Sequence, residues 1–140
     1  MLICGGTGAI GRAIVHTLVS AGARVAFSGR DRSRGEALSA ATGAIYIPHD
    51  DHRDGAPVVE EAARRLDGLH GLVLNAGTIM HARLDETPPD KLADALRVNV
   101  TVPITQARTA AALMSAGSAI VAASRAAAHW RPSTAPEASG

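Results

Sequence analysis

Residues 1–11, MLICGGTGAIG, decide the fold of this chain. A short apolar run of strand character leads into a cluster of glycines, and apolar residues at helical spacing follow. Gly6, Gly8 and Gly11 fit the pattern G-x-G-x-x-G, and starting from Gly5 instead gives the related G-x-x-G-x-x-G. Such a turn lets the backbone approach a pyrophosphate, whose charge the N-terminus of the following helix attracts. It therefore predicts a dinucleotide site, with a merely structural turn as the alternative.

Apolar runs alternate with helical stretches along the rest of the chain. The predicted strands are residues 1–4, 24–28, 44–48, 71–75 and 118–123, and the predicted helices are 10–21, 33–41, 57–66 and 89–114, the last bent near Pro103. This alternation predicts a parallel sheet with right-handed crossovers and helices on both faces. We therefore expect an α/β fold, a Rossmann-type doubly wound parallel sheet of about five strands that is incomplete at its C-terminal side.

Composition restricts the remaining possibilities. The 140 residues are 46% hydrophobic and 19% charged, which predicts a single globular domain, placed here at residues 1–124 with an irregular tail over 125–140. A net charge of +1 argues against a nucleic-acid partner, and no apolar run approaches the roughly 20 residues that span a membrane. A single cysteine, Cys4, and no signal peptide favour a cytoplasmic protein. The cluster 49–52 (HDDH) is interpreted as a solvated loop, so no metal site is expected.

The residues after the second predicted strand bear on the choice of dinucleotide. Arg30 falls at the strand end, and Arg32 follows closely. An arginine here accommodates the 2′-phosphate of NADP, whereas an acidic residue binds the ribose hydroxyl of NAD. NADP(H) is therefore favoured. NAD(H) stays possible through Asp31 if the register shifts by one, and an ordinary solvated turn is the remaining alternative.

Four further segments follow the glycine turn in order. They are His49-Asp50 after the third strand, Asn75-Ala76-Gly77 after the fourth, Val98-Asn99-Val100 in the long helical region, and Gly117–Ser124 at the fifth strand. Together with the turn, they resemble the short-chain dehydrogenase/reductase family over residues 1–124. The resemblance implies a Rossmann-fold oxidoreductase that uses a pyridine nucleotide.

The resemblance also implies residue roles. It assigns Ser124 to the carbonyl oxygen of a substrate and Asn99 to the active site, although Asn99 could instead satisfy backbone groups at a helix kink near Pro103. Asp50 would cap the adenine ring. The implied cofactor-binding residues are Gly5, Gly6, Thr7, Gly8, Ile10, Gly11, Arg30, Asp50, Asn75, Ala76 and Gly77.

The chain departs from the family pattern at several positions. Cys4 replaces the usual threonine, Ala9 replaces a glycine of the commoner pattern, and Arg125 takes the serine register if Ser124 lies one residue early. The family's Tyr-x-x-x-Lys pair is missing, because Pro136 and Gly140 fill those positions in PEASG. Neither the single tyrosine, Tyr46, nor the single lysine, Lys91, lies where it could substitute. Loss of such a general acid costs about 10²–10⁴-fold in rate.

These observations predict an NADP(H)-dependent oxidoreductase acting on a carbonyl or secondary alcohol, with an incomplete catalytic half. The alternatives are a non-catalytic NAD(P)-binding module and an inactive fragment, the truncated or frame-shifted remnant of a longer reductase. The substrate is a small carbonyl compound that the sequence does not identify. An unpaired edge at the fifth strand would favour self-association into a homo-oligomer.

Overall fold

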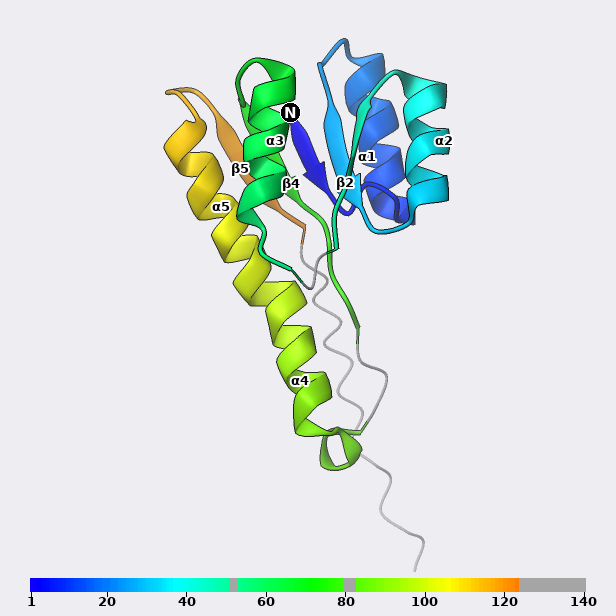
Figure 1. Ribbon diagram of the computed structural model, residues 1–140, viewed down its shortest axis with the longest axis vertical. Coiled ribbons are helices and arrows are strands. Elements are labelled where there is room, and N and C mark those ends of the chain that lie inside the picture. Colours follow the sequence, from blue (N-terminus) through cyan, green and yellow to red (C-terminus); the bar gives the residue numbers. More distant parts are fainter. Residues whose placement is uncertain (51–52, 80–82, 124–140) are drawn as a thin grey trace, which may run out of the picture.

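Figure 1 shows the computed structural model, which describes residues 1–50, 53–79 and 83–123. Five parallel strands form one sheet in the order β3-β2-β1-β4-β5. They are β1 (Leu2–Cys4), β2 (Ala26–Gly29), β3 (Ile45–Pro48), β4 (Gly71–Leu74) and β5 (Ala119–Ala122). The chain adds strands on one side of β1 and then returns to add β4 and β5 on the other. The predicted doubly wound sheet is confirmed, and the strand order reverses between β1 and β4.

Helices cover both faces of this sheet (Figure 1). On one face lie α1 (Ala9–Ser20) and α2 (Arg32–Thr42), and on the other lie α3 (Ala56–Leu66) and α5 (Val102–Leu113). The remaining helices are α4 (Pro89–Leu96), a π-helical turn over Arg97–Thr101 and a 3₁₀ turn over Leu84–Glu86. Among the described helices, none combines the length and the apolar character that a membrane span requires.

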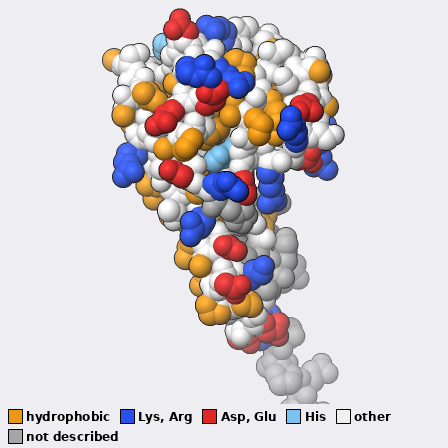
Figure 2. Space-filling view, in the orientation of Figure 1, with side chains coloured by type: hydrophobic (Ala, Val, Ile, Leu, Met, Phe, Trp, Pro, Cys, Tyr) orange, Lys and Arg blue, Asp and Glu red, His pale blue; other side chains and the backbone are white. Residues whose placement is uncertain are grey.

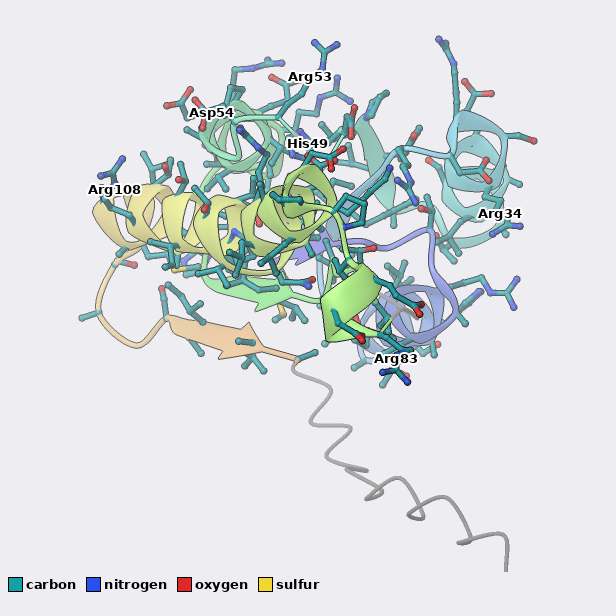
Figure 3. All side chains as sticks on the ribbon, turned by 90° about the horizontal axis from the view of Figure 1, so that it is seen from below. Arg34, His49, Arg53, Asp54, Arg83 and Arg108 are labelled. Atoms are coloured by element: carbon teal, nitrogen blue, oxygen red, sulfur yellow. The ribbon has the colours of Figure 1, made fainter. Side chains whose placement is uncertain are left out.

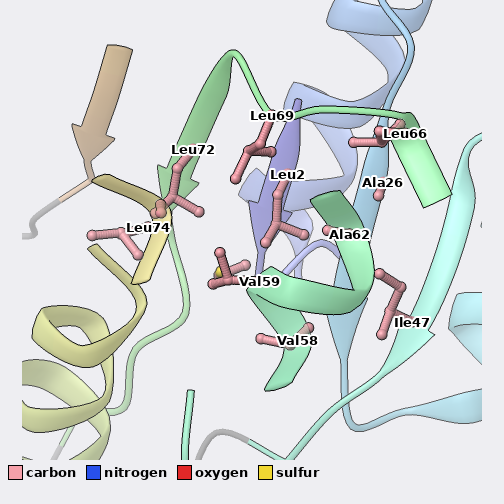
Figure 4. Close-up of a cluster of buried hydrophobic side chains, with 12 residues drawn as sticks. Leu2, Ala26, Ile47, Val58, Val59, Ala62, Leu66, Leu69, Leu72 and Leu74 are labelled. Carbon is pink, nitrogen blue, oxygen red and sulfur yellow. The ribbon is translucent and has the colours of Figure 1, made fainter. Parts of the chain in front are cut away.

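Helices bury both faces of the sheet, and neighbouring residues of a strand point to opposite faces. Leu2 and Ile3 are both fully buried, yet they belong to different core clusters. Leu2 packs with Val59 and Ala62 of α3, as Figure 4 shows, whereas Ile3 packs on the face of α1 and α2. Each such aliphatic side chain stabilises the fold by about 1.5–3 kcal/mol relative to an exposed one. This double coverage explains why the strands read as unbroken apolar runs.

Coverage is weaker at the β5 edge of the sheet. Ile120 and Val121 are adjacent and therefore face opposite sides, and their exposed fractions are 40% and 54%. The described part of the chain thus leaves β5 as an edge strand with both faces open, as expected for a sheet that stops at its fifth strand.

The long helical region predicted over 89–114 is interrupted upstream of Pro103. The irregularity is the π-helical turn Arg97–Thr101. The helical run continues through this turn into α5, because Leu96, Thr101 and Val102 all have right-handed helical dihedral angles. Pro103 therefore lies inside the run, where its missing N–H removes a helical hydrogen bond. Figure 2 shows hydrophobic side chains along α4, where it extends from the body of the molecule, and Leu92 and Leu96 are exposed there.

Candidate functional site

The turn between β1 and α1 is packed too tightly for side chains at two of its glycines. Gly5 has a φ of +74°, and a Cβ there would lie 2.8 Å from Cα of Ala76. A Cβ on Gly11 would lie 2.8 Å from Cα of Gly6 and would also collide with the carbonyl oxygen of Gly5. Glycine at these positions therefore lets the turn close against both the helix and the end of β4.

This turn leaves the start of α1 open toward an anion. Gly8 is the N-cap residue and has no side chain to cap the helix, and the first turn carries no acidic residue. The N–H groups at this end and the positive end of the helix dipole therefore favour negative charge. This end of α1 borders a cleft of about 490 Å³. The cleft is formed by the glycine turn, the residues after β2, the segment after β4 and Val98.

The residues after β2 supply charge to the same cleft. Arg30 follows the strand directly, is exposed and lines the cleft. Asp31 is the N-cap of α2, and its Oδ1 accepts a hydrogen bond of 3.0 Å from the backbone N–H of Arg34. Its Oδ2 also lies 3.2 Å from Nε of Arg34. The carboxylate of Asp31 is thus engaged by α2, while Arg30 stands at the strand end where the sequence predicted it.

The segment after β4 is tied to the turn and to the π-helical region. Nδ2 of Asn75 donates a hydrogen bond of 3.2 Å to the carbonyl oxygen of Gly5. Oδ1 of Asn99 accepts from the backbone N–H of Thr78 at 2.9 Å, and its Nδ2 donates to the carbonyl of Thr78 at 2.9 Å. Asn99 therefore satisfies backbone groups, but they belong to Thr78 and not to the helix near Pro103.

A second hollow, of about 470 Å³, adjoins this cleft. It shares Ile10 and the segment 75–78 with the cleft and adds Ile79, Asn99 and Ala123. Asn99 thus borders a space next to the cleft, at the end of β5. Ser124, the predicted catalytic serine, lies outside the described residues.

The structure brings most of the predicted cofactor residues together. Those that line the cleft are Gly5, Thr7, Gly8, Ile10, Arg30, Asn75, Ala76 and Gly77. Gly6 and Gly11 are buried behind it, since a Cβ on Gly6 would meet the ring of Phe27. Asp50 follows β3 and is half-buried, and it is not among the described residues that line the cleft. Figure 3 places its neighbour His49 well apart from Arg34.

Four residues that line the cleft had no role predicted from the sequence: Ala9, Arg34, Thr78 and Val98. The sequence carried a signal for one of them, because an aspartate directly before a helix is a capping residue whose partner lies three positions on. Thr78 and Val98 carried none. In the part of the chain that the structure describes, no three His, Cys, Asp or Glu residues group as metal ligands; Asp51 and His52 lie outside it.

Tyr46, the single tyrosine, has a structural partner. Its hydroxyl donates a hydrogen bond of 2.8 Å to the carbonyl of Gly29, at the end of β2. Burial raises the pKa of this phenol above its ordinary value, and the nearby Asp31 carboxylate acts in the same direction. A proton donor for neutral pH needs the opposite shift. That Tyr46 does not serve as the general acid stays a prediction.

Comparison with known proteins agrees with this geometry. Residues 1–136 match the family model described as short chain dehydrogenase. The chain belongs to the short-chain dehydrogenase family, and its dinucleotide fold is the one that the glycine turn predicted.

Two curated relatives are dehydrogenases. The chain is 36% identical over 104 residues to L-fucose dehydrogenase of Mus musculus, an alignment that covers 71% of this chain and 38% of the relative. It is 30% identical over 102 residues to 3-beta-hydroxysteroid dehydrogenase of Comamonas testosteroni, covering 70% of this chain and 40% of that protein.

Solved structures superpose well on the described fold. A short-chain dehydrogenase/reductase from Serratia marcescens has a TM-score of 0.83 at 31% identity. A short chain dehydrogenase from Burkholderia cenocepacia in complex with NADP has a TM-score of 0.83 at 32% identity. Each superposition covers 86% of this chain and 53% of the other. The chain therefore spans about half the length of these family members.

Proposed function

We propose that this chain binds NADP(H) and forms the cofactor-binding half of an oxidoreductase that interconverts a carbonyl compound and a secondary alcohol. The observation that carries the proposal is the cleft in which the uncapped start of α1 opens beside Arg30. The NADP complex of the Burkholderia cenocepacia protein supports the cofactor. The names of the two curated relatives, which refer to a sugar and a hydroxysteroid, support a hydroxyl-bearing substrate.

The residues present fit a pyridine nucleotide. Gly5 and Gly11 have no room for side chains, and their absence lets the turn close tightly. The N–H groups that follow Gly8 would bind the pyrophosphate. Arg30 would bind the 2′-phosphate. Asn75 holds the turn to the segment after β4, and Asn99 holds Thr78, so both fix walls of the cleft in which the nucleotide would lie. When bound, the nicotinamide supplies or accepts a hydride.

A direct titration tests the cofactor. NADPH emission is followed as protein is added, and NADH is titrated in parallel. We expect Arg30→Ala to raise the Kd for NADPH about tenfold, because it removes a charge-assisted contact to phosphate. Arg108→Ala, an exposed position on α5 away from the cleft, should leave binding unchanged. A well-folded protein with no affinity for either nucleotide would contradict the proposal.

A non-catalytic NAD(P)-binding module is the second candidate function. It is favoured by Pro136 and Gly140 at the positions of the family's tyrosine and lysine, and by the raised pKa of Tyr46. An assay that follows the loss of NADPH absorbance at 340 nm with a panel of aldehydes and ketones separates the oxidoreductase from the non-catalytic module. Turnover supports the oxidoreductase. Saturable NADPH binding without turnover supports the module, and cooperative unfolding without binding supports the inactive fragment.

A further inference from the structure

Tyr46 of β3 contacts both ends of the segment that joins β2 to α2. At one end, its hydroxyl donates a hydrogen bond of 2.8 Å to the carbonyl oxygen of Gly29, the last residue of β2. At the other end, its ring packs against Gly35 of α2, where a Cβ would lie 2.6 Å from Cε1 of Tyr46. Arg30, which lines the cofactor cleft, lies between these two contacts. One side chain therefore spans the segment that forms this wall of the cleft.

The Gly29 end of this segment is also packed against the glycine turn. A Cβ on Gly29 would lie 2.6 Å from Cγ2 of Thr7, so the Thr7 side chain rests directly on the backbone at the end of β2. Thr7 lines the cleft as well. A displacement of Gly29 therefore reaches the cleft by two routes, through the chain to Arg30 and through the contact with Thr7.

The ring of Tyr46 is itself held in place. Its centroid lies 5.4 Å from that of Phe27, with an angle of 32° between the two ring planes, and Tyr46 packs against the buried cluster on the α1 and α2 face of the sheet. An aromatic pair of this kind favours a defined arrangement of the two rings. The hydroxyl is therefore held where Gly29 accepts from it. A segment that is fixed before a ligand arrives costs less conformational entropy when the ligand binds.

We propose that Tyr46 is a positioning residue, which holds the segment from Gly29 to Gly35 in the conformation that receives the nucleotide. This inference rests on the proposed function, namely that the cleft binds a pyridine nucleotide. Tyr46 acts through the backbone, because it is not among the described residues that line the cleft. The same arrangement explains the two glycines: a side chain at Gly29 would displace Thr7, and one at Gly35 would displace the Tyr46 ring.

The first test compares Tyr46→Phe with Ser39→Ala. Each variant removes one part-buried hydrogen bond from a side-chain hydroxyl to a backbone carbonyl. Ser39 is the matched control, since its bond of 2.7 Å joins α2 to Ala44, just before β3, and it does not line the cleft. We expect Tyr46→Phe to raise the Kd of each nucleotide that the wild type binds about fivefold, the worth of one neutral hydrogen bond, and Ser39→Ala to stay within about twofold.

Gly35→Ala disturbs the same contact from the other side. Alanine is a better helix former than glycine, but its methyl group would push the Tyr46 ring away and separate the hydroxyl from Gly29. We expect this variant also to raise the Kd about fivefold. The double variant Gly35→Ala/Tyr46→Phe should bind like either single variant, because both changes break one contact. Additive losses in the double variant would overturn the inference.

The single tyrosine of the chain also gives a direct signal. The ¹³Cζ resonance of labelled Tyr46 reports the ionisation of its phenol. A phenolate cannot donate to Gly29, so by reciprocity the bound nucleotide should raise the pKa of Tyr46. The negative charge of the nucleotide acts in the same direction, and Gly35→Ala isolates that contribution because its ring no longer bonds to Gly29. The charged side chains that act on this phenol all come from the start of α2: Asp31, Arg32 and Glu36.

The possible results separate the inference from the function on which it rests. A well-folded wild type that binds neither nucleotide overturns the proposed function and the inference together. Saturable binding by the wild type with an unchanged Kd in Tyr46→Phe, or with equal losses in Tyr46→Phe and Ser39→Ala, overturns the Tyr46 inference alone. So does a pKa of Tyr46 that rises equally on nucleotide binding in the wild type and in Gly35→Ala.

Discussion

The side-chain amide of Asn99 pairs with the backbone of Thr78 through two hydrogen bonds of 2.9 Å, one in each direction. Asn99 lies in the π-helical turn, and Thr78 follows β4 by four residues. The pair therefore couples the helix to the loop that walls both the cofactor cleft and the adjoining hollow.

Replacing Asn99 should loosen the loop after β4. Asn99→Ala removes both hydrogen bonds to Thr78, and we expect the free energy of unfolding to fall by about 1 kcal/mol because these bonds are exposed to water. Amide hydrogen exchange at Thr78 should accelerate. Asn99→Asp is the matched control, since its carboxylate still accepts from the Thr78 N–H but cannot donate to the carbonyl. Equal Thr78 exchange rates in wild type and Asn99→Ala would contradict the assignment.

Two glycines of the turn should respond differently to alanine. Gly11→Ala forces a methyl group against the backbone of Gly5 and Gly6, and we expect a loss of about 1–3 kcal/mol in the free energy of unfolding. In Gly8→Ala the new Cβ lies 3.5 Å from the carbonyl oxygen of Gly5, an ordinary contact. That variant should keep its stability but bind NADPH more weakly, because the methyl group enters the cleft. Chemical denaturation and nucleotide titration separate the two effects.

Tyr46 should make the free energy of unfolding fall at alkaline pH. Its pKa is raised in the folded protein, mainly by burial, so the fold favours the protonated phenol. The stabilisation is fully present below the unfolded value of about 10 and is lost as pH rises through the folded pKa. We expect Tyr46→Phe to unfold about 1 kcal/mol more easily at pH 7, because the bond to Gly29 is gone, and to lose less stability than wild type above pH 10. If the free energy of unfolding of wild type and of Tyr46→Phe fell equally above pH 10, this account would be wrong.

Gln106 should tolerate an apolar replacement. It is 1% exposed, and its Nε2 has no hydrogen-bond partner among the described residues. A buried donor without a partner destabilises the fold by about 1–3 kcal/mol. We therefore expect Gln106→Met, which has a similar length, to leave the free energy of unfolding unchanged or to raise it. Gln106→Ala is the control and should destabilise the protein, because Cγ of Gln106 packs against Gly55. A less stable methionine variant would indicate that Nε2 is satisfied.

The fold could be predicted because its signals are local. All five predicted strands form, and the shifts are at their ends: β2, expected over 24–28, runs from Ala26 to Gly29. The π-helical turn was not predicted, because the segment Arg97–Thr101 carries no local signal that marks a π-helix. Pro103 suggested the interruption, and the π-helical turn lies directly upstream of it.

By itself, the sequence determined the glycine turn, the strand–helix alternation and the arginine at the end of β2. These depend on backbone freedom and apolar spacing within a few residues. Only the tertiary structure decided that Arg34 reaches the cleft and that Asn99 pairs with Thr78, 21 residues away. The reason is that crossover connections bring the carboxyl ends of parallel strands, which are distant in the sequence, to one edge of the sheet. Which side chains meet at that edge depends on tertiary packing and cannot be predicted from local sequence patterns.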